Sequence, residues 1–133
     1  ARVLAGGGRV GDKGYFVQPT VFGDVTDEMK IAKEEIFGPV MSILKFKDAD
    51  EVLARGNRTQ YGLAAAVWTR DLQKALRLSA GLKAGTVWVN CYEEGDLTVP
   101  FGGVKQSGFG SDKSLHAMDK FTDLKSTWID LRD

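Results

Sequence analysis

The chain has 133 residues, with 18 Lys+Arg balanced by 18 Asp+Glu, 43% hydrophobic residues and 27% charged residues. This composition is typical of a soluble globular protein, and the length predicts one domain that buries roughly two thirds of its unfolded surface around a single core. Balanced charge without a basic block argues against nucleic acid or an anionic membrane as the main ligand, and no apolar run approaches the roughly 18 residues of a membrane span.

Cysteine and histidine each occur once. One cysteine excludes an internal disulfide, and the pair excludes the usual zinc ligand sets, so we expect no metal site. With no visible signal peptide, this composition favours a reducing cytoplasmic environment. Ala1 is not an initiator methionine and residues 2–5 already form a predicted strand, so we expect the chain to be part of a longer protein.

Residues 6–14 are a glycine-rich segment that follows the strand predicted at 2–5. Residues 6–11 fit the pattern G-x-G-x-x-G of dinucleotide-binding loops, but that motif requires a helix next, and residues 15–22 are strand-like. A flexible surface loop is therefore the better interpretation. Pro19 bends the strand at 15–22 or confines it to a sheet edge.

One or two helical turns are predicted within residues 27–35, and from residue 40 strands and helices alternate. The predicted strands cover residues 40–46, 63–68 and 86–90. Their apolar character on both faces, with helices between them, indicates an α/β fold with a parallel sheet and flanking helices.

The two predicted helices between these strands have clear start signals. Asp48, followed by Glu51, forms a capping-box pattern, and Asp71 precedes the second helix, whose inner face should carry Leu72, Ala75 and Leu76. Glycines follow both helices and should end them.

Residues 91–110 form a long glycine-rich loop, and loops of this length in compact domains are usually functional. A short helix is predicted at 114–121 with Leu115 and Met118 facing inward. Residues 123–131 are predicted to form an exposed strand that needs a partner.

Cys91 ends the third strand of the alternation, and His116 could act as its base in a thiol hydrolase. A lone cysteine after a buried strand is more often a small packing residue, and nothing marks an oxyanion hole.

Residues 34–40 (EEIFGPV) place two carboxylates before an aromatic ring and a Gly-Pro turn. They are either solvated helix-end acids beside a core phenylalanine, or a site in which Glu35 accepts ribose hydroxyls beside the ring of Phe37. Residues 99–110 surround two phenylalanines with glycines, which suits either a pocket wall or a cap on the sheet.

Four segments together are highly specific: 34–40, 61–69 (YGLAAAVWT), 85–90 (GTVWVN) and 100–108 (PFGGVKQSG). In order and spacing they resemble the C-terminal part of the NAD(P)-dependent aldehyde dehydrogenases, over essentially the whole chain. The resemblance implies that residues 1–121 are the end of the catalytic domain and 122–133 an oligomerisation arm strand, in a homodimer or homotetramer.

The resemblance also implies site residues. Glu35 matches the acid that binds the nicotinamide ribose of NAD or NADP, and Phe37 the aromatic that packs beside the nicotinamide. Phe101 matches the aromatic wall of the aldehyde pocket, with Tyr92 and Asp96 in the variable loop that helps to choose the substrate. The family's nucleophilic cysteine, its water-activating glutamate and its oxyanion-hole asparagine precede this segment, so Cys91 is not that nucleophile and the stretch alone should be inactive.

The loop 93–98 (EEGDLT) and residues 111–117 (SDKSLHA) look most like the branch that oxidises aminoaldehydes, typified by gamma-glutamyl-gamma-aminobutyraldehyde dehydrogenase. Acids near a pocket mouth suit a cationic substrate tail. The alternative function is a non-catalytic α/β module that only self-associates, because it lacks the nucleophile and the cofactor domain.

Overall fold

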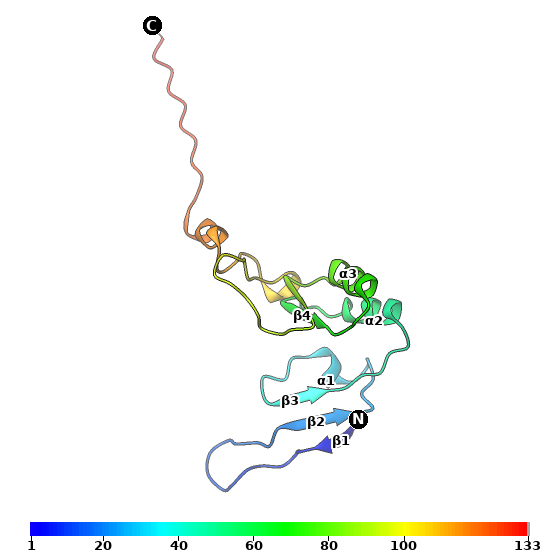
Figure 1. Ribbon diagram of the computed structural model, residues 1–133. Helices are drawn as coiled ribbons and strands as arrows, with labels where there is room; N and C mark the ends of the chain where they lie inside the picture. Colours follow the sequence, from blue (N-terminus) through cyan, green and yellow to red (C-terminus); the bar gives the residue numbers. More distant parts are fainter. Residues whose placement is uncertain (133) are drawn as a thin grey trace. The chain divides into compact units, whose positions relative to one another are not determined.

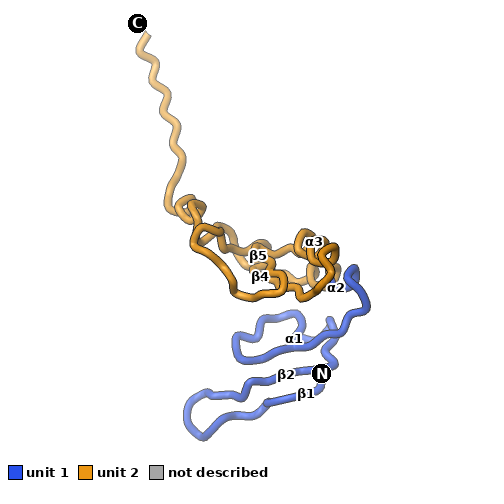
Figure 2. Tube along the Cα trace, in the orientation of Figure 1, with its two compact units in different colours: residues 1–52 blue, residues 53–133 orange. Residues whose placement is uncertain are grey.

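The computed structural model describes residues 1–132 (Figure 1). They divide into two compact units, Ala1–Val52 and a second that begins at Leu53 (Figure 2). The prediction of one domain around a single core is therefore wrong: the buried hydrophobic residues are Val25 in the first unit and Ala75 and Leu78 in the second. Each unit has too few strands to enclose a large apolar interior by itself.

The first unit contains a three-stranded sheet in the order β1-β2-β3, formed by β1 (Arg2–Ala5), β2 (Thr20–Gly23) and β3 (Val40–Ser42). β1 pairs antiparallel with β2, and β2 pairs parallel with β3. Pro19 lies directly before β2, so the strand begins where a backbone N–H is again available. β2 is the central strand, so of the two alternatives for Pro19 the edge position is wrong. The short helix α1 (Lys30–Lys33) forms part of the segment between β2 and β3.

The glycine-rich segment joins β1 to β2 as a long hairpin (Figure 1). Its two sides are tied by hydrogen bonds from Val10 N to Phe16 O and from Gln18 N to Gly8 O, both 2.9 Å. No helix follows the glycines, which confirms that G-x-G-x-x-G here is a loop rather than a dinucleotide-binding motif.

In the second unit β4 (Ala64–Val67) and β5 (Thr86–Val89) form a parallel pair. Between them runs α3 (Leu72–Gly81), which packs against both strands and buries Ala75 and Leu78. Leu72 and Leu76 are 71% and 61% exposed, so their predicted inward position is wrong. The face that meets the sheet is the i, i+3 pair of Ala75 and Leu78.

The α/β class and the parallel pairing are confirmed, but the single parallel sheet is not. β3 pairs with β2 in the first unit, whereas β4 pairs with β5 in the second. An apolar run predicts that a strand exists, and a helix between two strands predicts that they run parallel. Neither signal identifies the partner, and the backbone of β3 is satisfied by β2.

The predicted helix starts are confirmed. At α2 (Ala49–Gly56), Glu51 N donates to Asp48 Oδ1 and Lys47 N donates to Glu51 Oε2, each at 2.8 Å. At α3, Lys74 N donates to Asp71 Oδ1 at 3.0 Å, and this hydrogen bond holds the pKa of the Asp71 carboxyl below its usual value. Both helices end at the predicted glycines.

Beyond β5 the chain forms two 3₁₀ helices, η1 (Lys105–Ser107) and η2 (Leu115–Phe121). Leu115 and Met118 are exposed, so their predicted inward position is wrong, because this short helix packs neither side chain against the sheet. Residues 122–132 run as an extended segment without strand pairing among the described residues, whereas the sequence predicted a strand at 123–131 (Figure 1). Asp133, the end of the predicted arm, lies outside the described residues.

A close contact of glycine backbones holds the second unit together. Gly62 O accepts hydrogen bonds from Gly85 N and Val104 N, both 3.0 Å, and Gly62 N donates to Ser107 Oγ at 2.9 Å. A Cβ at Gly85 would lie 1.7 Å from Gly102 O. The segment after Phe101 can therefore reach the starts of β4 and β5 only because Gly85 has no side chain.

We expect Gly85→Ala to lower the free energy of unfolding by about 1–3 kcal/mol, because the new methyl group must displace the backbone at Gly102. Urea denaturation checks this. Gly56→Ala is the matched control, since a Cβ there meets only Leu82 Cδ2 at 3.5 Å. Equal stability of the two variants would contradict the proposed constraint.

Candidate functional site

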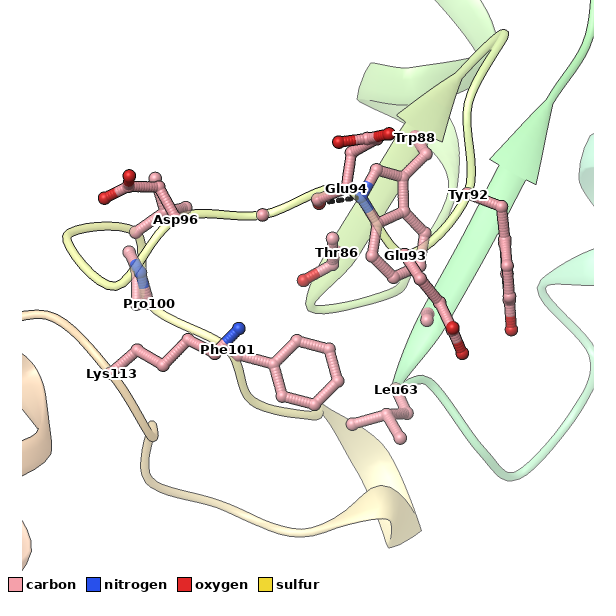
Figure 3. A pocket seen from close by; sticks show the side chains of 13 residues that line it. Leu63, Thr86, Trp88, Tyr92, Glu93, Glu94, Asp96, Pro100, Phe101 and Lys113 are labelled. Carbon is pink, nitrogen blue, oxygen red and sulfur yellow. Dashed lines mark hydrogen bonds between the residues drawn. The ribbon is translucent and has the colours of Figure 1, made fainter.

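The second unit contains a cavity of about 480 Å³ (Figure 3). One wall is the loop that follows β5, and the other is the segment that contains Phe101. The floor comes from β4, β5 and the residue before β4. The lining residues are Leu63, Ala64, Thr86, Trp88, residues 92–96, residues 99–101 and Lys113.

The cavity brings together three residues that the sequence predicted for one pocket, namely Tyr92, Asp96 and Phe101. Sequence reasoning missed Trp88 and Lys113 as lining residues. The alternation of side chains along β5 was a usable signal for Trp88. No such signal marked Lys113, because the segment between Phe101 and Lys113 has no hydrophobic periodicity that would show which way its side chains point.

Phe101 is fixed by its backbone. Phe101 N donates to Asp112 O at 2.8 Å, and Asp112 N donates to Phe101 O at 2.7 Å, so the two residues form an isolated antiparallel bridge. The Asp112 carboxylate also forms an ion pair with Lys120, and its hydrogen bond with the Lys120 side chain lowers the pKa of Asp112. The half-buried ring of Phe101 therefore lines the cavity from a backbone that is held at both its N–H and its C=O by Asp112.

The opposite wall is fixed by Trp88. Its Nε1 donates to Glu94 O at 2.6 Å, and its ring lies 5.1 Å from the Tyr92 ring at 58°. Glu93 lies between these two anchors with φ of 59°, a left-handed conformation that is uncommon for glutamate. In Figure 3 the Glu93 side chain points toward the side of the cavity where Leu63 and Phe101 lie, while the Glu94 carboxylate points away from it.

Asp96 has a structural role in this loop. Its Oδ1 accepts hydrogen bonds from Thr98 N at 2.8 Å and Thr98 Oγ1 at 2.7 Å, which closes an Asx turn. The Thr98 hydroxyl, followed by the Thr98 N–H and the charge of Lys113, holds the pKa of Asp96 below its usual value. Asp96 thus places a fixed negative charge at the wall.

The predicted cofactor residues lie in the first unit, after α1. Glu34 forms an ion pair with Lys30 at 3.4 Å, whereas the Glu35 side chain makes no hydrogen bond or ion pair with the described residues. The ring of Phe37 is 97% exposed. A carboxylate without a partner, two residues from an exposed ring, is chemically able to bind the hydroxyls of a ribose and its attached planar base.

The alternative thiol site is not assembled. His116 Nδ1 lies 3.5 Å from Asp119 Oδ2, and no hydrogen bond joins it to Cys91 within the part of the chain that is described. Among residues 1–132 no group of three or more His, Cys, Asp and Glu side chains is placed to hold a metal ion.

Residues 1–127 match the family model described as "Aldehyde dehydrogenase family". The chain therefore belongs to the aldehyde dehydrogenase family.

Individual relatives agree with this assignment. The chain is 57% identical over 126 residues to "Aldehyde dehydrogenase, cytosolic 2" of Macroscelides proboscideus, covering 95% of this chain and 52% of that protein. It is also 57% identical over 129 residues to "Aldehyde dehydrogenase, mitochondrial" of Mesocricetus auratus, covering 97% of this chain and 26% of that protein. The chain thus spans about half the length of the first of these curated relatives and about a quarter of the second.

Solved structures show the same relation. P. syringae AldA, an indole-3-acetaldehyde dehydrogenase in complex with NAD+ and IAA, superposes with a TM-score of 0.91 at 57% identity, over 98% of this chain and 27% of that one. Aldehyde dehydrogenase KauB from Pseudomonas aeruginosa also superposes with a TM-score of 0.91 at 57% identity, over 98% of this chain and 27% of that one. Within residues 1–132, no helix is long and apolar enough to span a bilayer.

We expect Thr98→Val to raise the pKa of Asp96, because it removes the hydroxyl that contributes most to lowering it. Carboxyl NMR titration measures this directly, with Thr26→Val as the control. A depressed folded-state pKa stabilises the fold above the unfolded pKa, and this contribution is lost as pH falls through the folded pKa. The variant should therefore lose less stability on acidification, and an unchanged Asp96 titration would contradict the hydrogen-bond assignment.

Proposed function

We propose that this chain is the C-terminal part of an enzyme that oxidises an aldehyde to the carboxylic acid with NAD+. The observation that carries the proposal is the family match over residues 1–127. It is supported by the cavity walled by Phe101, which has the form expected of an aldehyde pocket. The nucleophilic cysteine that the family implies has no counterpart here, so catalysis depends on the rest of the enzyme.

We assign cofactor binding in this chain to Glu35 and Phe37. The unpaired Glu35 carboxylate accepts hydrogen bonds from the two ribose hydroxyls, and the exposed ring of Phe37 packs against the nicotinamide. When bound, the cofactor supplies the hydride acceptor. NAD+ is favoured over NADP+ because the similar AldA and Bacillus cereus structures are complexes with NAD+.

We assign Phe101 to the wall of the aldehyde pocket, with Tyr92 on the opposite side and Asp96 at its edge. The finer proposal is an aldehyde with a cationic tail. Glu93, Glu94 and Asp96 are three acidic residues of the loop that lines this cavity, and acidic residues gathered in one loop attract positive charge. Glu93 is the acid whose side chain points inward in Figure 3.

For the assembly, we propose that residues 1–121 belong to the catalytic domain and that 122–133 form an arm that pairs with another copy in a cytoplasmic homodimer or homotetramer. Leu124 and Trp128 support this part of the proposal, since they are 106% and 95% exposed on an extended segment. Unpaired extended backbone with apolar side chains readily adds to a sheet edge.

The test of the cofactor role is Glu35→Gln in the intact enzyme. We expect kcat/KM for NAD+ to fall about tenfold, because hydrogen bonds to a charged group contribute about 1.5 kcal/mol. NADH formation is followed by its absorbance, and thermal unfolding shows that the variant is folded. Glu34→Gln is the control, since Glu34 is already paired with Lys30.

The 133-residue chain alone should show no turnover and no measurable affinity for NAD+ in a titration. An active fragment would refute the assignment of catalysis to the rest of the enzyme. An intact protein with no aldehyde turnover, but with normal self-association, would instead support the non-catalytic module.

The test of the substrate class compares γ-aminobutyraldehyde with butanal. We expect the intact enzyme to have a higher kcat/KM for the amine, and Glu93→Gln to reduce that preference about threefold, as expected for a partly solvated charge pair. Glu28→Gln, which removes a carboxylate that does not line the cavity, should leave the ratio unchanged. Equal efficiency with both aldehydes in the wild type would refute the aminoaldehyde assignment.

A further inference from the structure

Lys113 is the one basic side chain among the described residues that line the cavity. Its Nζ lies 5.7 Å from the centroid of the Phe101 ring. It also reaches the opposite loop, since a Cβ built on Gly95 would lie 3.7 Å from this atom. Figure 3 shows the ammonium beside Phe101.

The Lys113 ammonium donates no hydrogen bond within residues 1–132, in contrast to two other lysines in the same stretch of chain. Lys105 Nζ donates to Asn57 O at 3.1 Å and to Thr59 O at 3.0 Å, and Lys120 pairs with Asp112. Within residues 1–132, Lys113 Nζ forms no hydrogen bond and no ion pair. Its three N–H donors are therefore available to a ligand.

The backbone holds Lys113 in this position at a conformational cost. Lys113 and Ser114 have φ values of 60° and 53°, so two successive residues other than glycine are left-handed. Ser114 N donates to Leu97 O at 2.7 Å, which ties this strained turn to the loop of the opposite wall. Strained residues persist only where the surrounding structure fixes them, so this turn holds the Lys113 backbone at the cavity wall.

We propose that Lys113 is a specificity-determining residue of the aldehyde pocket, which binds an anionic group at the distal end of the substrate and opposes a purely cationic one. This inference rests on the proposed function. The carboxylates of the opposite loop attract positive charge, and the Lys113 ammonium limits that attraction. The balance between the two decides which charged aldehydes the pocket accepts.

The experiment uses three aldehydes with the same four-carbon length, namely butanal, γ-aminobutyraldehyde and succinate semialdehyde. Steady-state kinetics of the intact enzyme are compared for wild type, Lys113→Met and Lys113→Arg. Lys113→Met keeps the apolar stem and removes the charge, while Lys113→Arg keeps the charge. Lys83→Met is the control, because this lysine does not line the cavity.

For Lys113→Met we expect kcat/KM to rise about threefold for the amine and to fall about threefold for the carboxylate, with butanal unchanged, since one partly solvated charge contributes on this scale. Lys113→Arg should restore the wild-type ratios.

If butanal is oxidised normally and the ratio of amine to carboxylate does not move in Lys113→Met, the inference is wrong while the proposed function stands. An equal loss for all three aldehydes would also overturn it, because that pattern marks a purely structural contact with Phe101. Absence of turnover with every aldehyde in the wild type would refute the proposed function itself, and the inference with it.

Discussion

The structure of the second unit depends on one steric constraint, the close approach of glycine backbones at Gly62, Gly85 and Gly102. A side chain at Gly85 would overlap the Gly102 carbonyl, while the Gly62 carbonyl accepts hydrogen bonds from the start of β5 and from the segment after Phe101. The same contact therefore aligns the two strands and positions the aromatic wall. Because the floor and one wall of the cavity share this anchor, a change in backbone packing there would alter the pocket without touching a lining side chain.

Around this frame the charged side chains divide into those that support the fold and those that are available to a ligand. Asp48, Asp71 and Lys105 are engaged by backbone groups at helix ends or loops, and Asp112 is paired with Lys120. Glu35 in the first unit and Lys113 in the second make no such contacts within residues 1–132. Desolvating a charge without a partner is costly, so groups that will contact a ligand are best left in water until it binds. This difference in hydrogen bonding and ion pairing distinguishes Glu35 from Glu34, and Lys113 from Lys105 and Lys120.

Much of the local structure could be predicted from the sequence because it depends on neighbouring residues. The caps at Asp48 and Asp71, the helix ends at glycines and the loop character of residues 6–14 all follow from interactions within a few positions. Errors arose where the outcome depended on distant partners. The sequence predicts β3 in one sheet with β4 and β5, and Leu72 and Leu115 facing inward, and the structure shows otherwise. An apolar strand or helix face carries no information about which surface will cover it.

The sequence by itself determined the family, because four motifs at fixed spacing are specific without any knowledge of contacts. Through that resemblance it also predicted that Tyr92, Asp96 and Phe101 line one pocket. Only the tertiary structure showed that Asp96 is held by Thr98, that Glu35 is unpaired while Glu34 is not, and that Lys113 reaches the same cavity. The physical reason is that hydrogen-bond commitment and exposure depend on which segments meet in space. The sequence specifies which residue types are present and how they are spaced. Folding decides which of their polar atoms are bonded within the protein and which remain available to a ligand.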